Sequence, residues 1–275
     1  MSQFLKPTSK WQKFKKMKTQ DLNGKVALVV GGTSGMGKAT ASLLAERGAN
    51  VIVASKTKDS VVATVTELSN NNPEIKVTGK VVDITNSESV KAFIAEIEKE
   101  NKIDYLVNAS GIFRPKPFLD TTPDEYAALL DINTGFYFIT QAVARKMKEN
   151  SGGAIVNIGS YWSENVVKGM PTSAYSVAKA GLHALTKHLA VELAPENIRV
   201  NAIAPGLFVT NVLNDVVGLE KVEEAYNSLL GLNPTGRNGK PEQAASAIVF
   251  LLSDESAFTT GAILAVDGGM STGRG

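Results

Sequence analysis

Residues 25 to 37 of the chain read KVALVVGGTSGMG, an apolar run that leads directly into a glycine-rich turn. The apolar run predicts a buried strand, and the helix formers after residue 37 predict a helix. Gly31, Gly35 and Gly37 carry no side chain where the backbone must turn sharply and approach an anion, and the helix directs its free amide groups at that anion. The stretch therefore predicts a site for the pyrophosphate group of a dinucleotide.

The rest of the chain alternates short apolar runs with longer segments of helical periodicity. This alternation predicts an α/β fold in which a parallel sheet is covered by helices on both faces. The length of 275 residues and the 43% share of hydrophobic residues suit one large domain. In such a sheet, ligands bind beyond the carboxyl ends of the strands. The expected strands are residues 25–30, 51–54, 77–82, 104–107, 154–158, 198–203 and 263–266.

A second informative feature is a tyrosine and a lysine four residues apart, Tyr175 and Lys179, within a run of helix formers. On a helix this spacing places both side chains on one face. A free tyrosine titrates near pH ~10, and a neighbouring cation favours the phenolate form. The pair therefore predicts a tyrosine that gives and takes protons during catalysis.

With these motifs and several others, the chain resembles the short-chain dehydrogenase/reductase family over residues 21–275. The resemblance implies a Rossmann-type, doubly wound parallel sheet of about seven strands in a single domain, which follows a basic extension at residues 1–20. It also implies an oxidoreductase that transfers a hydride between a nicotinamide cofactor and a carbonyl or alcohol. The motifs that carry the resemblance, in the order of the family, are the glycine turn at 31–37, Asp83, residues 108–111, Asn133, Ser160, the Tyr175 and Lys179 pair, Pro205 with Gly206, and residues 266–269.

The catalytic residues of the family fall on four positions of this sequence. By resemblance, Tyr175 is the general acid and base, Lys179 stabilises the tyrosinate and holds the nicotinamide ribose, and Ser160 binds the substrate oxygen. Asn133 matches the asparagine that holds a water molecule in the proton relay. Ser163 lies closer to Tyr175 in the sequence and is the rival of Ser160, but the end of a strand fixes a side chain better than a loop does.

The end of the second strand indicates which nicotinamide cofactor to expect. An acidic residue there would bind the ribose hydroxyls of NAD(H), whereas this chain has Ser55 and Lys56, a hydrogen-bond donor and a cation. Family members with such a pair resemble NADP enzymes, so we expect NADP(H) rather than NAD(H). Lys58 either assists or is a solvated lysine. The residues expected at the cofactor are Gly31, Thr33, Ser34, Gly35, Met36, Gly37, Ser55, Lys56, Asp83, Asn108, Gly111, Tyr175, Lys179, Pro205, Gly206, Val209 and Thr210.

Apolar and aromatic residues near these motifs favour a small, moderately apolar ketone or alcohol as substrate. The pocket candidates are Ile112, Phe113, Tyr161, Trp162, Phe208, Val212, Leu213 and Tyr226. A 3-oxoacyl-[acyl-carrier-protein] reductase is an open alternative, although Ser151 and Glu196 stand where such enzymes tend to present basic residues. A non-catalytic NADP-binding sensor is a further alternative, against which the complete catalytic set argues. The segment at 206–240 is expected to be a mobile cover over the site.

The composition limits other classes of function. The chain has no cysteine and only two histidines, His183 and His188, so we expect no disulfide and no metal site. Both histidines are interpreted as packing or surface residues. No run approaches the ~20 apolar residues that span a bilayer, and the N-terminus lacks the pattern of a secretion signal, so a cytoplasmic protein is expected.

The positive charge is concentrated at the N-terminus. Residues 1–20 contain six lysines and no acidic residue, so they carry a charge of +6. The net charge of the chain is +2, which leaves −4 for residues 21–275. A mildly acidic domain argues against nucleic-acid binding. Within this extension, Trp11, Phe14 and Met17 recur at every third position, a spacing compatible with a short docked helix or with a solvated arm. The family resemblance implies a homotetramer whose subunits pair through helices at about 124–149 and 174–194.

Overall fold

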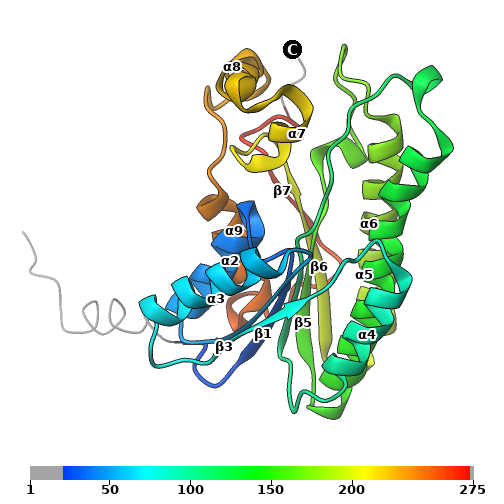
Figure 1. Ribbon diagram of the computed structural model, residues 1–275. Coiled ribbons are helices and arrows are strands. Elements are labelled where there is room, and N and C mark those ends of the chain that lie inside the picture. The colour runs from blue at the N-terminus through cyan, green and yellow to red at the C-terminus, as the bar shows by residue number, and fades with distance from the viewer. Residues whose placement is uncertain (1–20, 273–275) are drawn as a thin grey trace, which may run out of the picture.

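Seven strands form one parallel sheet in the computed structural model, which describes residues 21–272 (Figure 1). All seven expected strands are confirmed, and their ends lie within two residues of the predicted ones. The strands are β1 (Val26–Val30), β2 (Asn50–Ser55), β3 (Val77–Val81), β4 (Tyr105–Asn108), β5 (Gly153–Ile158), β6 (Ile198–Pro205) and β7 (Ile263–Val266).

The strands are arranged in the order β3-β2-β1-β4-β5-β6-β7, and every neighbouring pair is parallel. The chain therefore winds outward from β1 in one direction and from β4 in the other. In a doubly wound sheet, the connections on the two sides of such a reversal diverge, and the crevice that binds ligands is expected there, at the carboxyl ends of the strands. The doubly wound α/β fold predicted from the sequence is confirmed.

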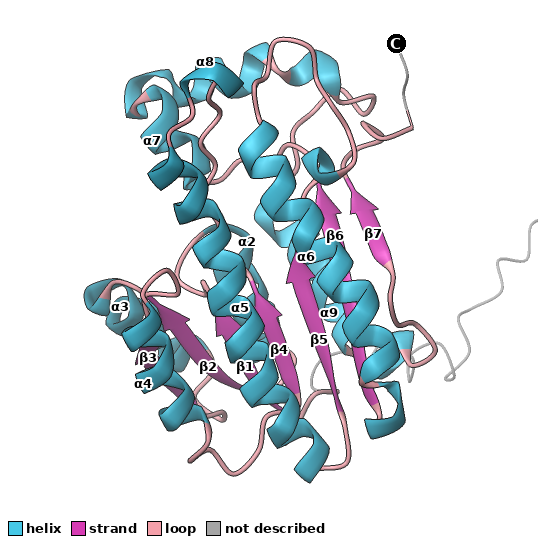
Figure 2. Cartoon of the chain, turned by 90° about the vertical axis from the view of Figure 1, so that its right-hand side faces the viewer, coloured by secondary structure: helices cyan, strands magenta, loops and turns pink. Residues whose placement is uncertain are grey.

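Three helices cover each face of the sheet (Figures 1 and 2). One layer consists of α2 (Gly35–Glu46), α3 (Lys58–Asn71) and α9 (Pro241–Leu252), and the other of α4 (Ser87–Ile97), α5 (Pro123–Glu149) and α6 (Ser173–Glu192). The start of α5 is set by a capping box between Thr122 and Glu125, with Pro123 at the first helical position.

The core has two layers because successive strand residues point to opposite faces of the sheet. In β1, Ala27 and Val29 pack with residues of α2 and α9, whereas Leu28 and Val30 pack with residues of α4, α5 and α6. All four side chains are fully buried. Coverage on both faces is the reason that this strand is apolar at every position.

The segment between β6 and α9 lies beyond the carboxyl end of β6 and forms the upper left part of the molecule in Figure 1. It contains α7 (Asn214–Val217), α8 (Val222–Ser228) and several short 3-10 turns. This location agrees with the expected cover over the site, while its mobility stays a prediction. The basic extension at 1–20 lies outside the described residues. Between residues 21 and 272, no helix combines the length and apolarity needed to cross a membrane.

Candidate active site

The glycine turn after β1 admits no larger side chain at two of its positions. A Cβ atom on Gly31 would lie 2.5 Å from the backbone nitrogen of Ser110, and one on Gly37 would lie 2.1 Å from the carbonyl oxygen of Gly31. Gly31 and Gly35 also adopt positive φ angles of 85° and 50°. The first turn of α2, residues 35–38, has no acidic residue that would repel an anion.

The ends of β2 and β3 bring further candidate cofactor residues beside this turn. The hydroxyl of Thr33 donates to Ser55 Oγ at 3.0 Å, and Lys56 Nζ lies 2.8 Å from a carboxylate oxygen of Asp83. Partial burial would raise the pKa of Asp83, but hydrogen bonds from Lys56 and Thr85 outweigh it and hold the pKa below its ordinary value. The exposed lysine and the anionic aspartate therefore form an ion pair at the rim of the crevice.

Ser160 and Tyr175 meet at the end of β5. Ser160 is buried and follows that strand by two residues, where its Oγ accepts a hydrogen bond from the backbone of Trp162 at 3.2 Å. Its side chain also acts on the phenol of Tyr175, which belongs to the first turn of α6. Burial raises the pKa of Tyr175 above its ordinary value, and the Ser160 hydroxyl opposes that rise. The lowered pKa expected from the neighbouring lysine is therefore not seen, because desolvation dominates.

Lys179 lies one helical turn beyond Tyr175 and is buried. Its Nζ atom donates to the carbonyl oxygen of Ile158 at 2.7 Å and lies 5.9 Å from the centroid of the Tyr175 ring. Burial lowers the pKa of Lys179 to about 8. Beside it, the amide of Asn133 donates to the carbonyl oxygen of Ala178 at 2.6 Å, which ties α5 to the turn of α6 that carries the lysine.

Asn108, at the end of β4, turns its side chain into the interior. The amide nitrogen donates to Thr140 Oγ1 at 2.9 Å and to Asn157 Oδ1 at 2.8 Å, and Asn157 in turn donates to Thr186 Oγ1 at 2.9 Å. This chain of polar side chains connects β4 and β5 to α5 and α6. The Asn108 side chain thus steadies the central sheet, and only the backbone after it, toward Gly111, faces the crevice near Lys179.

The loop after Pro205 and Gly206 approaches the glycine turn. A Cβ atom on Gly35 would lie 3.4 Å from the Thr210 side chain. However, the backbone N–H of Val209 donates to the carbonyl of Gly239 at 2.9 Å, and that of Thr210 donates to the hydroxyl of Tyr226 at 3.1 Å. Val209 and Thr210 are both expected at the cofactor, and their backbone N–H groups are engaged within the covering segment.

Aromatic rings form a wall beside the catalytic tyrosine. The centroid of the Phe113 ring lies 5.1 Å from that of Tyr175 and 5.9 Å from that of Trp162, and the Tyr161 ring packs on Trp162 at 5.3 Å. These three pocket candidates lie where the sequence suggests.

Two other pocket candidates have different positions from those expected. Phe208 belongs to the core, where its ring occupies the space left by Gly239. Tyr226 is buried, and its hydroxyl donates to the carbonyl of Thr210 at 3.1 Å as well as accepting from the amide of the same residue. Tyr226 therefore fastens α8 to the loop after β6, and neither ring forms part of the pocket wall.

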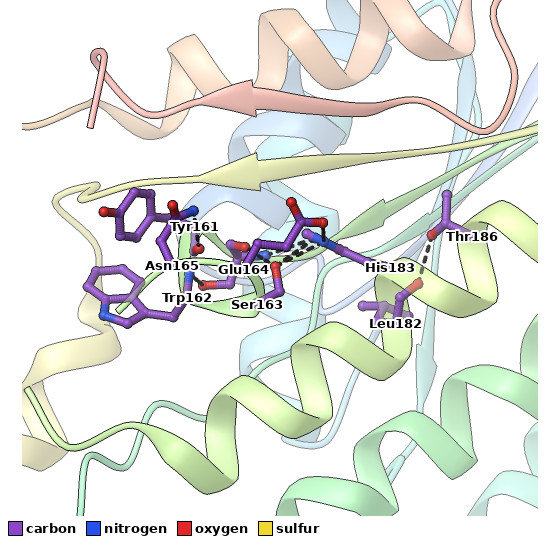
Figure 3. Close-up of polar contacts among 9 residues, drawn as sticks. Tyr161, Trp162, Ser163, Glu164, Asn165, Leu182, His183 and Thr186 are labelled. Carbon is purple, nitrogen blue, oxygen red and sulfur yellow. Dashed lines mark hydrogen bonds and ion pairs between the residues drawn. The ribbon is translucent and has the colours of Figure 1, made fainter. Parts of the chain in front are cut away.

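His183 has contacts that the sequence interpretation as a packing residue missed. It reaches from α6 to the turn that follows β5 and contacts Ser160, Ser163 and Glu164 (Figure 3). The available signal was its spacing, because His183 follows Lys179 by four residues and so shares a helix face with it.

A crevice with a glycine turn at one side and a serine, tyrosine and lysine at the other defines a dinucleotide-dependent oxidoreductase of the Rossmann type. Comparison with known proteins makes this more specific. A family model described as "Enoyl-(Acyl carrier protein) reductase" matches residues 30–271. The chain belongs to the short-chain dehydrogenase/reductase family, whose members act on CH–OH groups with a nicotinamide cofactor.

Individual relatives have several activities. The chain is 37% identical over 250 residues to a 3alpha-hydroxysteroid dehydrogenase of Mediterraneibacter gnavus. The aligned stretch covers 90% of this chain and 97% of that protein. The chain is also 37% identical over 252 residues to the 3-oxoacyl-[acyl-carrier-protein] reductase FabG of Thermotoga maritima, covering 90% and 98%. The structure of L-sorbose reductase from Gluconobacter frateurii, complexed with NADPH and L-sorbose, superimposes with a TM-score of 0.83 at 26% identity, covering 94% and 100%.

Proposed function

We propose that residues 21–275 form one catalytic domain that reduces a small, moderately apolar carbonyl compound with NADPH, or oxidises the corresponding alcohol with NADP. The observation that carries this proposal is the group of residues at the end of β5, where the buried Ser160 side chain acts to lower the pKa of the Tyr175 phenol and Lys179 Nζ lies 5.9 Å from the centroid of the same tyrosine ring. A binding module without catalysis would have little need for such a group.

In the reductive direction, a bound nicotinamide cofactor would supply the hydride that the carbonyl carbon receives. Tyr175 donates its phenol proton to the carbonyl oxygen, and the hydroxyl of Ser160 donates a hydrogen bond to the same oxygen. A phenol with a raised pKa is protonated at neutral pH, which suits this donation. The ammonium group of Lys179 then stabilises the tyrosinate until it regains a proton, and Asn133 holds the helix segment that carries the lysine.

The glycine turn fits the pyrophosphate of a nicotinamide dinucleotide. The backbone comes close to Ser110 and to α2 only because two side chains are absent, and the N-terminus of α2 offers free amide groups to an anion. Ser55 and Lys56 would hold a 2′-phosphate. To do so, Lys56 would leave its ion pair with Asp83 and pair with the phosphate instead. This arrangement supports NADP(H) over NAD(H).

The cofactor preference is tested with Lys56→Ala. A charge-assisted hydrogen bond contributes about 1.5–3 kcal/mol, so the variant is expected to bind NADPH about 10-fold or more weakly. NADH lacks the phosphate, and its affinity should be unchanged. Equal weakening for both cofactors would contradict the assignment of Lys56.

The substrate side supports an apolar carbonyl compound that carries a further oxygen. Phe113, Tyr161 and Trp162 form an aromatic wall next to Tyr175. Among the side chains that the structure describes, the indole nitrogen of Trp162 is one of two buried polar atoms without a hydrogen-bond partner. An acceptor oxygen on the substrate would satisfy this N–H group, which otherwise costs about 1–3 kcal/mol.

A 3-oxoacyl-[acyl-carrier-protein] reductase is the second candidate, because such enzymes match the chain over nearly its whole length. Against it, Glu196 stands where the family resemblance implies a basic residue that would meet an acidic carrier protein, and it pairs with Lys148. Comparing 3-oxoacyl thioesters with simple diketones separates the two candidates.

We also propose a homotetramer located in the cytoplasm. Helices α5 and α6 leave Tyr137, Phe138, Val177 and Val191 exposed, and a groove runs between the two helices on the outer surface. Exposed apolar side chains of this kind favour burial against another subunit. Light scattering that gives the mass of a monomer would contradict the tetramer.

The catalytic proposal is tested with NADPH oxidation across ketones, diketones, 3-oxoacyl thioesters and quinones. Tyr175→Phe is expected to abolish turnover while NADPH affinity stays close to that of the wild type. Turnover retained by this variant would remove Tyr175 from the mechanism. NADPH binding by the wild type without turnover of any carbonyl would instead support the sensor.

A further inference from the structure

His183 closes a ring of hydrogen bonds around the backbone of Ser160. The backbone N–H of Ser160 donates to His183 Nε2 at 3.4 Å, and Ser163 Oγ lies 2.9 Å from His183 Nδ1. The hydroxyl of Ser163 donates to the carbonyl oxygen of Ser160. Figure 3 shows Ser163 and Glu164 turned toward His183 from one side while the ring extends from α6 on the other. Both backbone polar groups of the catalytic serine are therefore engaged by this pair.

The ring also packs directly on the strand end. A Cβ atom on Gly159 would lie 2.0 Å from His183 Nε2, so only glycine permits this approach. His183 is 3% exposed, which leaves its nitrogen atoms dependent on partners inside the protein. Position and burial together make the imidazole a rigid support immediately beneath the residue that binds the substrate oxygen.

The hydrogen-bond pattern requires one tautomer. Nε2 accepts from the Ser160 N–H and must be unprotonated, so in the neutral ring the proton resides on Nδ1. Nδ1–H then has two acceptors nearby, Ser163 Oγ at 2.9 Å and a carboxylate oxygen of Glu164 at 3.5 Å. Ser163 Oγ also lies 3.3 Å from Nε2, and its hydroxyl donates to the Ser160 carbonyl oxygen. In this form the Ser160 N–H has an acceptor, the Ser160 carbonyl has a donor, and Nδ1–H faces an acceptor.

We propose that neutral His183, with its proton on Nδ1, is a positioning residue that holds Ser160 in the geometry needed for catalysis. The inference rests on the proposed carbonyl reduction. Ser160 contacts the reacting oxygen there, and an error of about 1 Å in such a group can cost about 100-fold in rate.

Protonation of His183 would break this support, because Nε2 would become a second donor facing the Ser160 N–H. The charged groups that act on the ring are Glu164, whose carboxylate lies 3.5 Å from Nδ1, together with Lys179 and Lys187 on α6. Burial lowers the pKa of His183 below its ordinary value, and the two lysines add to this effect while Glu164 opposes it. The supporting neutral form is thus present at neutral pH and is lost as the pH falls through the lowered pKa.

The first test compares two substitutions by kcat, KM and NADPH affinity. His183→Gln places an uncharged oxygen near the position of Nε2 and should keep a substantial kcat. Because glutamine does not titrate, the fall in kcat at acidic pH that His183 causes in the wild type should be absent. His183→Met removes the acceptor and should lower kcat about 10- to 100-fold without weakening NADPH binding. Ser163→Ala, a milder change, should lower kcat in the same way, whereas Ser246→Ala, at an exposed serine of α9, should not. Wild-type kcat in both His183→Met and Ser163→Ala would overturn the proposal.

The second test reads the tautomer without any substrate. The chain has only two histidines, so nitrogen-15 labelling of histidine in untagged protein gives two ring systems, which His183→Gln assigns. The Nδ1-protonated tautomer is expected for His183 at pH 8, and an Nε2-protonated ring would overturn the proposal. If the wild type reduces none of the carbonyls but shows the expected tautomer, the proposed function fails and the hydrogen-bond ring stands.

Discussion

Replacing Lys179 by methionine should make the protein more stable while it destroys activity. The charge of Lys179 is desolvated, and its pKa is lowered from 10.5 to about 8. At 1.36 kcal/mol per pH unit, this lowering corresponds to a cost of about 3 kcal/mol for holding the charged form at pH 7. The methionine leaves the carbonyl of Ile158 without its hydrogen-bond donor, and this loss lowers the free energy of unfolding by about 1 kcal/mol. A net gain of about 2 kcal/mol is expected.

The gain should depend on pH in a defined direction. Because the pKa of Lys179 is lower in the folded state, the unfolded chain binds more protons between about pH 8 and pH 10.5, and wild-type stability rises across this window. The advantage of Lys179→Met should therefore fall by about 2 kcal/mol between pH 7 and pH 10.

The assay is scanning calorimetry at fixed protein concentration and at both pH values. A gain of about 2 kcal/mol should raise Tm by about 4–8 °C at pH 7 for a chain of this size. Lys187→Met, at an exposed lysine of the same helix, is the matched control and should change stability by less than about 0.5 kcal/mol. A Lys179→Met variant that is less stable at pH 7, or equally stabilised at both pH values, would refute the reasoning.

Three further predictions concern the rest of the site. Gly37→Ala should lower the free energy of unfolding by more than about 2 kcal/mol and abolish NADPH binding, because its Cβ would lie 2.1 Å from a carbonyl oxygen of the turn. The control Gly231→Ala has open space around it and should be nearly neutral in thermal unfolding. Tyr226→Phe removes a hydroxyl bonded twice to the loop after β6 and should raise the substrate KM about 3- to 10-fold in steady-state kinetics; an unchanged KM would contradict this fastening role. Trp162→Phe keeps an aromatic ring but loses the unpaired N–H, so kcat/KM should fall about 10-fold for a diketone and little for a monoketone, and an equal fall for both would contradict substrate recognition by the indole.

Much of the fold could be predicted because its signals are local. A strand covered on both faces must be apolar at every position, and this is visible in residues 26–30 without knowledge of the partners. The glycine turn is equally local, since the close approach of Gly37 to Gly31 spans only six residues. The spacing of Tyr175 and Lys179 predicts a shared helix face for the same reason.

The pKa of Tyr175 shows where local reasoning ends. Spacing predicts an influence of Lys179 but contains no measure of desolvation, which depends on everything packed around the ring. In the folded protein, burial raises the pKa and outweighs the other effects. The pocket candidates illustrate the same limit. Phe208 is an aromatic residue of the kind that lines pockets, yet its ring fills the space beside Gly239 in the core.

The sequence alone determined the seven strands, the dinucleotide turn and the family, because each depends on residue types at short or regular spacing. Only the tertiary structure decided that Lys56 pairs with Asp83, that the Asn108 side chain braces the sheet, and that His183 encloses the backbone of Ser160. The contact of His183 with Ser160 joins residues 23 positions apart, and that of Asn108 with Asn157 joins residues 49 positions apart. Their distances follow from how β5, α6 and the loops pack together, which no local pattern encodes.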